Sequence, residues 1–368
     1  MSRFITLAIH TYEKALSLRT LLENEGITVE LHNVNLEDPR LSSGVRVRIP
    51  EHDLPLALRI VENRELFADN GSPDRPAHTV LVPVDFSEHS YNAACAACEV
   101  GRRHNGSITL LYSYLDPYLA GKVQLTDTLS YETGERGARQ QLEGEARRLM
   151  DNFAERLRSH MKRGHIPIVK VNREVAEGVP EDTIVDFAKA NTPRLIVMGT
   201  RSAERKQADM IGSVTAEVLD EGRFTVLTVP EPLDCEAVLS PRHILFFSNL
   251  DQNDILAIDT LYRLFGDNES TVTLAQMPRK NRFSESAAEK ALSRLTEYCA
   301  ENYKQYRFET APVRITDDDE FSRLQDRYGF DLIVLPNRRR NALSRLINPG
   351  LAHRIIFGSD IPMLVIPV

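Results

Sequence analysis

The sequence predicts an α/β fold with two doubly wound, five-stranded parallel sheets, preceded by a small α+β module. Three observations support this prediction. The 368-residue chain is longer than one ordinary domain. From about residue 78, short apolar runs alternate with helix-like stretches, which is typical of a parallel sheet covered on both faces. The same alternation then occurs a second time, as in a tandem repeat.

Residues 1–66 predict a compact βαββα module. The strand-like runs are 4–10, 28–34 and 45–50, and the helix-like runs are 12–27 and 51–63. The apolar stripe of the first helix consists of Leu16, Leu18, Leu21 and Leu22. The aliphatic helix, the EGI turn and the VRVRIPEHD step resemble a family of small signal-transducing modules. Residues 67–77, rich in Gly, Pro and Asp, predict an exposed linker.

Residues 78–232 predict the first repeat. Its five strands are expected at 79–85, 107–114, 166–175, 194–199 and 224–230. Ser87 is placed to cap the helix that starts at Glu88. A long helix follows the second strand, and its apolar positions recur every three or four residues. They are Leu142, Ala146, Leu149, Phe153, Leu157 and Met161.

Residues 241–368 predict a second, degenerate repeat. The runs 242–249, 271–277, 330–336 and 361–367 match the first, second, fourth and fifth strands of the first repeat. The fourth strands stand 137 positions apart, whereas Asp85 and its counterpart Asn249 stand 164 apart. The first repeat therefore carries an insertion, which we assign to its polar segment and long helix.

Composition narrows the class of protein. The net charge of −8 argues against a chain-wide nucleic-acid surface. No apolar run approaches the ~20 residues of a membrane-spanning helix, so we expect no membrane partner and a cytoplasmic location. Cys95 and Cys98 form a CxxC pattern among small residues, which favours a buried helix over a metal or redox site. We predict no metal ligands.

The sequence also predicts a binding crevice in the first repeat. In such a sheet, ligands bind at the carboxyl ends of the strands where the winding reverses, between the first and fourth strands. Asp85 can accept hydrogen bonds there from a ribose or a base, and Gly199 lets backbone approach a ligand closely. Gly212 and Ser213 open the next helix, whose free N–H groups favour a phosphate.

The spacing after the fourth strand resembles the nucleotide-binding branch of the universal stress protein family. That branch has G, two residues, G, nine residues, then G and S or T. Here the pattern is matched by Gly199, Ser202, Gly212 and Ser213, with Ser202 in place of the middle glycine. Ser202 either weakens binding through backbone strain or donates its hydroxyl. VPVDFSEHS, EGVPEDTIV and LIVMGT also read like the family, over about residues 78–368.

The resemblance implies a Rossmann-like fold and an adenine nucleotide, ATP or AMP, as ligand. Position by position, it places Pro83, Val84 and Asp85 on the adenosine side and Met198 near the base. It also implies that Gly199, Gly212 and Ser213 hold the ribose and phosphates. Ser87 and His89 read more simply as a helix cap and an exposed helix residue.

The second repeat departs from this pattern, so we expect ATP in the first repeat only. The corresponding positions carry Asn249, Pro336, Arg339, Pro349 and Gly350. Proline at 336 fixes φ and fills the space that a glycine leaves open. The basic run 338–340 is either an anion-binding loop or a solvated one.

We therefore expect a non-catalytic, nucleotide-binding stress or signalling protein, with no catalytic residue in the crevice. The alternatives are a scaffold or apolar-ligand carrier without nucleotide, and a slow ATPase. The apolar last strands, 224–230 and 361–367, need partners because unpaired sheet edges aggregate. The resemblance implies that they pair with each other within one chain as a pseudo-dimer; a homodimer of chains stays open.

Overall fold

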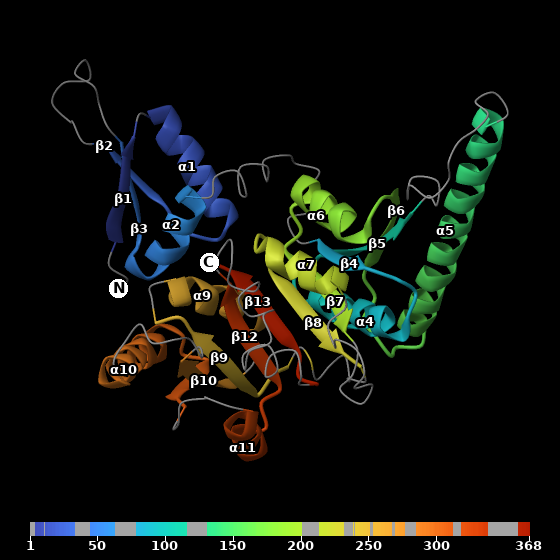
Figure 1. Ribbon diagram of the computed structural model, residues 1–368. Helices are drawn as coiled ribbons and strands as arrows, with labels where there is room; N and C mark the ends of the chain where they lie inside the picture. Colours follow the sequence, from blue (N-terminus) through green and yellow to red (C-terminus); the bar gives the residue numbers. More distant parts are fainter. Residues whose placement is uncertain are drawn as a thin grey trace. The chain divides into compact units, whose positions relative to one another are not determined.

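The computed structural model (Figure 1) divides into two compact units. One comprises Met1–Arg75 with Asp251–Arg263 and Val368, and the other comprises Pro76–Leu250 with Leu264–Pro367. The structure describes residues 4–10, 12–33, 45–62, 79–115, 131–200, 213–231, 238, 240–250, 253–266, 269–276, 285–311, 318–337 and 360–368.

The N-terminal module has the expected βαββα order. Its elements are β1 (Phe4–His10), α1 (Tyr12–Asn24), β2 (Glu30–Asn33), β3 (Val45–Pro50), the short 3-10 helix η1 (Glu51–Asp53) and α2 (Leu54–Glu62). Within the described part of this module, the strands form an antiparallel sheet in the order β1-β3-β2. Leu18, Leu22 and Ile60 lie in its core. Leu16 is 38% exposed and Ala15 is buried instead, so the predicted stripe was wrong at this position.

The first repeat builds one half of a larger sheet. Its elements are β4 (Val80–Pro83), α4 (Glu88–Arg103), β5 (Ser107–Tyr114), α5 (Tyr131–Lys162), β6 (Lys170–Glu177), α6 (Pro180–Asn191), β7 (Leu195–Thr200), α7 (Ser213–Glu221) and β8 (Val226–Pro230). The strands are parallel and lie in the order β6-β5-β4-β7-β8. In chain order this is third, second, first, fourth, fifth, which is the order expected from the sequence.

The second repeat builds the other half. Its elements are β9 (His243–Ser248), α9 (Asn253–Phe265), β10 (Ser270–Gln276), α10 (Glu285–Asn302), β11 (Tyr306–Thr310), α11 (Asp318–Tyr328), β12 (Leu332–Asn337) and β13 (Met363–Pro367). The order β11-β10-β9-β12-β13 repeats that of the first half, and neighbouring strands are again parallel.

The two five-stranded halves join in one continuous sheet, ten-stranded over the described residues. The last strands of the repeats, β8 and β13, pair antiparallel at the centre of Figure 1. Thr228 lies opposite Met363 and Val226 lies opposite Val365. The expected pairing of these two strands within one chain is therefore confirmed. It places the most apolar edges of both repeats out of solvent.

The helices of the first repeat bury the expected faces, except at one position of α5. Cys95 and Cys98 lie buried in α4, and Ser87 caps this helix by accepting a hydrogen bond from the Ser90 N–H. The buried positions of α5 are Ala146, Met150, Phe153, Ala154, Leu157 and Met161. Leu149 is 37% exposed, so its place in the predicted stripe was wrong. No helix in the described part of the chain is long and apolar enough to span a bilayer.

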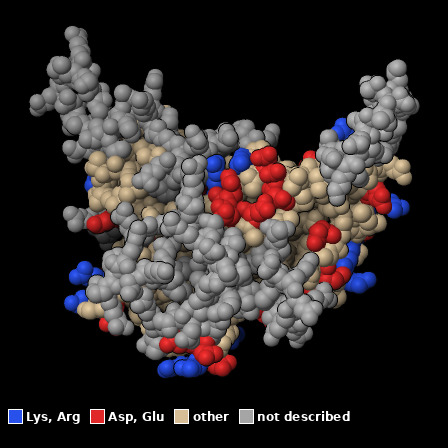
Figure 2. Space-filling view, in the orientation of Figure 1, with Lys and Arg blue, Asp and Glu red and all other residues tan. Residues whose placement is uncertain are grey.

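Acidic side chains gather in Figure 2 over the region where Figure 1 shows α6 and α7. Basic groups are interspersed: the Glu221 carboxylate, at the end of α7, pairs with Lys189 and Arg223. Exposed pairs of this kind each contribute at most about 1 kcal/mol to folding.

Candidate functional site

The site lies where the winding of the first repeat reverses. β4 has β5 on one side and β7 on the other, so the carboxyl ends of β4 and β7 lie at the place where sheets of this kind bind ligands. Asp85 lies two residues after the end of β4, and Gly199 is the second-to-last residue of β7. The helix α7 begins at Ser213. Ser202 and Gly212 lie outside the described residues, as do Arg339, Pro349 and Gly350 of the second repeat.

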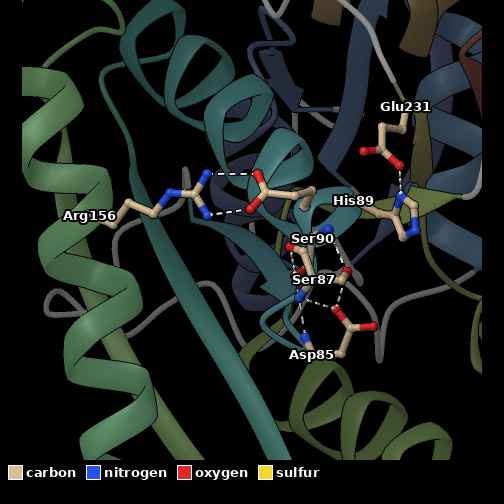
Figure 3. Close-up of polar contacts among 7 residues, drawn as sticks. Asp85, Ser87, His89, Ser90, Arg156 and Glu231 are labelled. Atoms are coloured by element: carbon tan, nitrogen blue, oxygen red, sulfur yellow. Dashed lines mark hydrogen bonds and ion pairs between the residues drawn. The ribbon is translucent and has the colours of Figure 1, made fainter.

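Asp85 presents an exposed carboxylate with one oxygen held in place. Its Oδ1 accepts hydrogen bonds from the Ser87 backbone N–H (3.0 Å) and from the Ser87 hydroxyl. The Asp85 N–H in turn donates to the Ser90 hydroxyl oxygen over 3.4 Å. Figure 3 shows the second carboxylate oxygen pointing away from both serines. The first turn of α4 thus orients the carboxylate and leaves one oxygen directed elsewhere.

These hydrogen bonds also determine the charge of Asp85. Partial burial raises the pKa of Asp85, but the bonds from the Ser87 hydroxyl, the Ser87 N–H and Ser90 together outweigh it. The net pKa of Asp85 therefore lies below its ordinary value. The side chain is an ionised hydrogen-bond acceptor throughout the neutral range.

A left-handed residue follows Asp85. Phe86 has a φ of 64°, and Leu250, its counterpart in the second repeat, has a φ of 58°. This conformation costs a non-glycine residue about 1–2 kcal/mol. The Phe86 ring lies 4.4 Å from the Tyr112 ring and 5.8 Å from the Phe153 ring, centroid to centroid. Aromatic packing on β5 and α5 therefore offsets the strain and fixes the turn that carries Asp85.

His89 ties the start of α4 to the end of β8. Its Nδ1 lies 2.6 Å from Glu231 Oε2 (Figure 3), and its side chain is 15% exposed. The prediction that His89 is an exposed helix residue was wrong. The pairing joins residues 142 positions apart in sequence, so no local pattern could have indicated it.

Gly199 has a packing role that the sequence did not predict. A Cβ built on it would lie 2.3 Å from the carbonyl oxygen of His89 and 2.9 Å from the nitrogen of Ser90. The missing side chain admits the backbone of α4 against β7. Contact of Gly199 with a ligand stays a prediction.

The remaining predicted residues lie deeper. Val84 is 6% exposed and donates its N–H to the Leu111 carbonyl (2.9 Å). Met198 is 4% exposed and belongs to the apolar core. Pro83, at the end of β4, is half-buried. Of the predicted residues whose side chains the structure describes, Asp85 is thus the exposed one. Contact of the others with a ligand stays a prediction.

At the corresponding place in the second repeat, a hydrogen bond joins the ends of two strands. Asn249, at the position of Asp85, donates its side-chain N–H to the carbonyl of Pro336 over 3.2 Å. Pro336 stands at the position of Gly199. The ends of β9 and β12 are therefore joined directly. The hydrogen bonds of the Asp85 carboxylate described above are instead with Ser87, at the start of its own helix.

Metal ligation has no support in the described residues, where no three His, Cys, Asp or Glu side chains are placed to share an ion. The polar groups around Asp85 instead suit an organic ligand with hydroxyl or amine donors.

Comparison with known proteins gives consistent results. Residues 76–230 match the model of the universal stress protein family. A universal stress protein of Methanocaldococcus jannaschii is 27% identical over 158 residues, which cover 42% of this chain and 82% of that protein.

The fold is similar to that of a solved structure. A universal stress protein from Archaeoglobus fulgidus superposes with a TM-score of 0.50 and 14% identity, over 79% of this chain and 96% of its own. Another universal stress protein, solved in complex with cAMP, is 18% identical with a TM-score of 0.29, over 42% of this chain and 98% of its own. The match to the family model and the similarity to the Methanocaldococcus jannaschii protein both indicate a universal stress protein domain at residues 76–230.

Proposed function

We propose that the first repeat binds an adenine nucleotide, ATP or AMP, and that the protein is a non-catalytic stress or signalling protein that responds to it. The observation that carries the proposal is the Asp85 carboxylate. It is ionised, it lies where the winding of the sheet reverses, and one of its oxygens points away from its own helix. Such an oxygen can accept a hydrogen bond from a ribose hydroxyl or a base amine.

The phosphates would lie at the start of α7. The first N–H groups of a helix lack intrahelical partners, and the helix dipole favours an anion there. α7 begins at Ser213, where the sequence pattern expects the phosphate contact. Gly199, Ser202 and Gly212 would complete the contact through the loop before the helix.

Binding is favoured over hydrolysis by the chemistry of Asp85. An efficient general base has a pKa near the working pH, whereas the pKa of Asp85 is held below its ordinary value. The same hydrogen bonds that make it a firm acceptor make it a weak base. A slow ATPase would need another residue to activate water.

The test is calorimetric titration of the full chain with ATP, using four proteins: wild type, Asp85→Ala, Gly212→Asp and the control Asn249→Ala. Losing a charge-assisted hydrogen bond costs about 1.5–3 kcal/mol, so Asp85→Ala should weaken binding about 10- to 100-fold. Gly212→Asp should abolish binding, because it places a negative charge beside the phosphates. Asn249→Ala should bind as wild type does.

Each rival function predicts another result. No heat from the wild type at millimolar ATP would remove the nucleotide proposal and favour the scaffold or apolar-ligand carrier. Adenine absorbance released on denaturing the purified protein would support the proposal instead. Phosphate release that persists in both Asp85→Ala and Gly212→Asp would indicate a contaminating ATPase.

A further inference from the structure

We propose that the second repeat supports the nucleotide site of the first, and that Asn337 is the positioning residue through which it does so. This inference rests on the proposed function. Asn337 ends β12 and is 4% exposed. Its side-chain Nδ2 donates to the carbonyl of Leu219 in the last turn of α7, over 3.1 Å. A residue of one repeat thus caps the helix that binds phosphate in the other.

The helix needs such support because it is short. α7 has nine residues, and isolated helices of this length are unstable in water. Its last carbonyls lack intrahelical partners. The Gly222 N–H reaches the Leu219 carbonyl over 3.2 Å, with Gly222 in the left-handed conformation at a φ of 61°. Asn337 supplies the second donor to that same oxygen.

The apolar contacts of α7 also come from both repeats. Val218 and Leu219 of α7 are buried in one cluster with Phe247, Leu335 and Val365 of the second repeat. The antiparallel pairing of β8 with β13 runs beside this cluster. The second repeat therefore contributes to the apolar core in which α7 packs.

The chemistry of Asn337 favours a positioning role over a purely stabilising one. Its Oδ1 is buried and has no hydrogen-bond partner among the residues that the structure describes. A buried acceptor without a partner costs about 1–3 kcal/mol, which an apolar residue of similar size would avoid. The Leu219 carbonyl of α7 needs a hydrogen-bond donor, and the side-chain nitrogen of Asn337 supplies it. In the second repeat the bond from Asn249 to Pro336 joins the two strand ends at the corresponding place, so we expect this repeat to act as a support rather than as a binding site.

The experiment compares wild type, Asn337→Ala and the control Asn302→Ala in the full chain. Asn302 also donates its amide to a helix carbonyl, that of Tyr298 over 2.8 Å, but within α10 and on the surface. Affinities for ATP and for adenosine are measured separately. Losing one hydrogen bond of about 1 kcal/mol should weaken ATP binding about fivefold in Asn337→Ala. Adenosine affinity should be unchanged, because adenosine does not reach α7. Asn302→Ala should change neither affinity.

Amide hydrogen exchange without ligand gives an independent readout. Exchange of residues 213–221 should be faster in Asn337→Ala and unchanged in Asn302→Ala. An unchanged ratio of ATP to adenosine affinity, with unchanged exchange of α7, would overturn the inference while the proposed function stands. If the wild type binds no nucleotide, the proposed function fails, and exchange alone then decides whether Asn337 positions α7.

A second variant covers the case in which Asn337→Ala does not fold. Asn337→Thr introduces the residue that the first repeat carries at the corresponding position, Thr200, which is itself buried at the end of β7. Its hydroxyl is too short to replace the amide, so the same loss of ATP affinity and the same faster exchange are expected.

Discussion

The carbonyl oxygen of His89 occupies the space that a side chain on Gly199 would need, with 2.3 Å between that oxygen and a Cβ built on the glycine. Separations under about 3 Å do not occur between a real Cβ and a backbone atom, so α4 and β7 meet at this point because residue 199 is glycine. The contact lies beside the proposed crevice. It sets the distance between the helix that orients Asp85 and the strand that precedes the proposed phosphate-binding residues.

Replacing this glycine should therefore destabilise the first repeat. Gly199→Ala forces the backbone of α4 away from β7, and overpacking of this kind costs about 1–3 kcal/mol. Urea unfolding measures the loss. The matched control is Gly144→Ala in α5, where nothing lies within 4 Å of the added Cβ. Alanine favours a helix interior by about 0.5–1 kcal/mol over glycine, so the control should be neutral or more stable. Equal stability of the two variants would contradict the close contact.

Gly199 also illustrates what sequence reasoning could reach. Its type and position predicted that backbone comes close to a ligand, and that contact stays a prediction. The sequence could not show the close approach of α4, because the neighbour is His89, more than a hundred residues earlier in the chain. The strand order could be predicted from the sequence, because alternating apolar runs and a repeated pattern allow few topologies.

The ion pair between Glu88 and Arg156 should contribute only modestly to folding. Both guanidinium nitrogens lie 2.7 Å from the carboxylate oxygens, and the Arg156 guanidinium lies 3.7 Å from the centroid of the Tyr91 ring. The two charged side chains are 48% and 58% exposed, so solvent screens the attraction.

A double-mutant cycle with Glu88→Gln and Arg156→Lys measures this coupling. We expect about 1 kcal/mol or less, decreasing with added salt. Lysine can neither form the two-pronged bond nor lie flat on the ring. A coupling above about 2 kcal/mol, unaffected by salt, would contradict this account.

His160 should make the protein less stable in mild acid. Burial lowers the pKa of His160 below 6.5, and the nearby positive charges of His165, Arg163 and Arg156 add to the effect. As pH falls below about 6.5, the unfolded chain binds the proton before the folded protein does. The free energy of unfolding therefore falls until the pH reaches the folded-state pKa.

The variant His160→Gln removes this component. Urea midpoints measured from pH 7.5 to 5 should decline less in the variant than in wild type. Parallel curves for the two proteins would show that His160 is not the titrating group.

The pairing of β8 with β13, which joins the two repeats, can be tested by an engineered disulfide. Thr228 lies directly opposite Met363, so the pair Thr228→Cys with Met363→Cys should form a bond within one chain. Val365 lies two positions further along the strand, where diagonal Cα atoms are about 7–8 Å apart. Thr228→Cys with Val365→Cys should therefore link poorly. Non-reducing gels distinguish the products. Links found only between chains would contradict the pairing within one chain.

The features that the sequence did not reveal are long-range side-chain contacts. The substitutions at Asn249 and Pro336 marked the second repeat as degenerate, but not that these two residues bond to each other. Phe86 is a residue type that disfavours positive φ, so local preference predicted another conformation. Packing of its ring on Tyr112 and Phe153 outweighs that preference. Capping by Ser87 was predictable because it depends on neighbours three residues apart.

The number of nucleotides bound per chain tests the central claim most directly. Equilibrium dialysis of the full chain against radiolabelled ATP, carried to saturation, should give one nucleotide per chain, and Asp85→Ala should reduce occupancy at subsaturating ATP. A value of two would contradict the expectation that the first repeat alone binds the nucleotide, and a value of zero would contradict the nucleotide site itself.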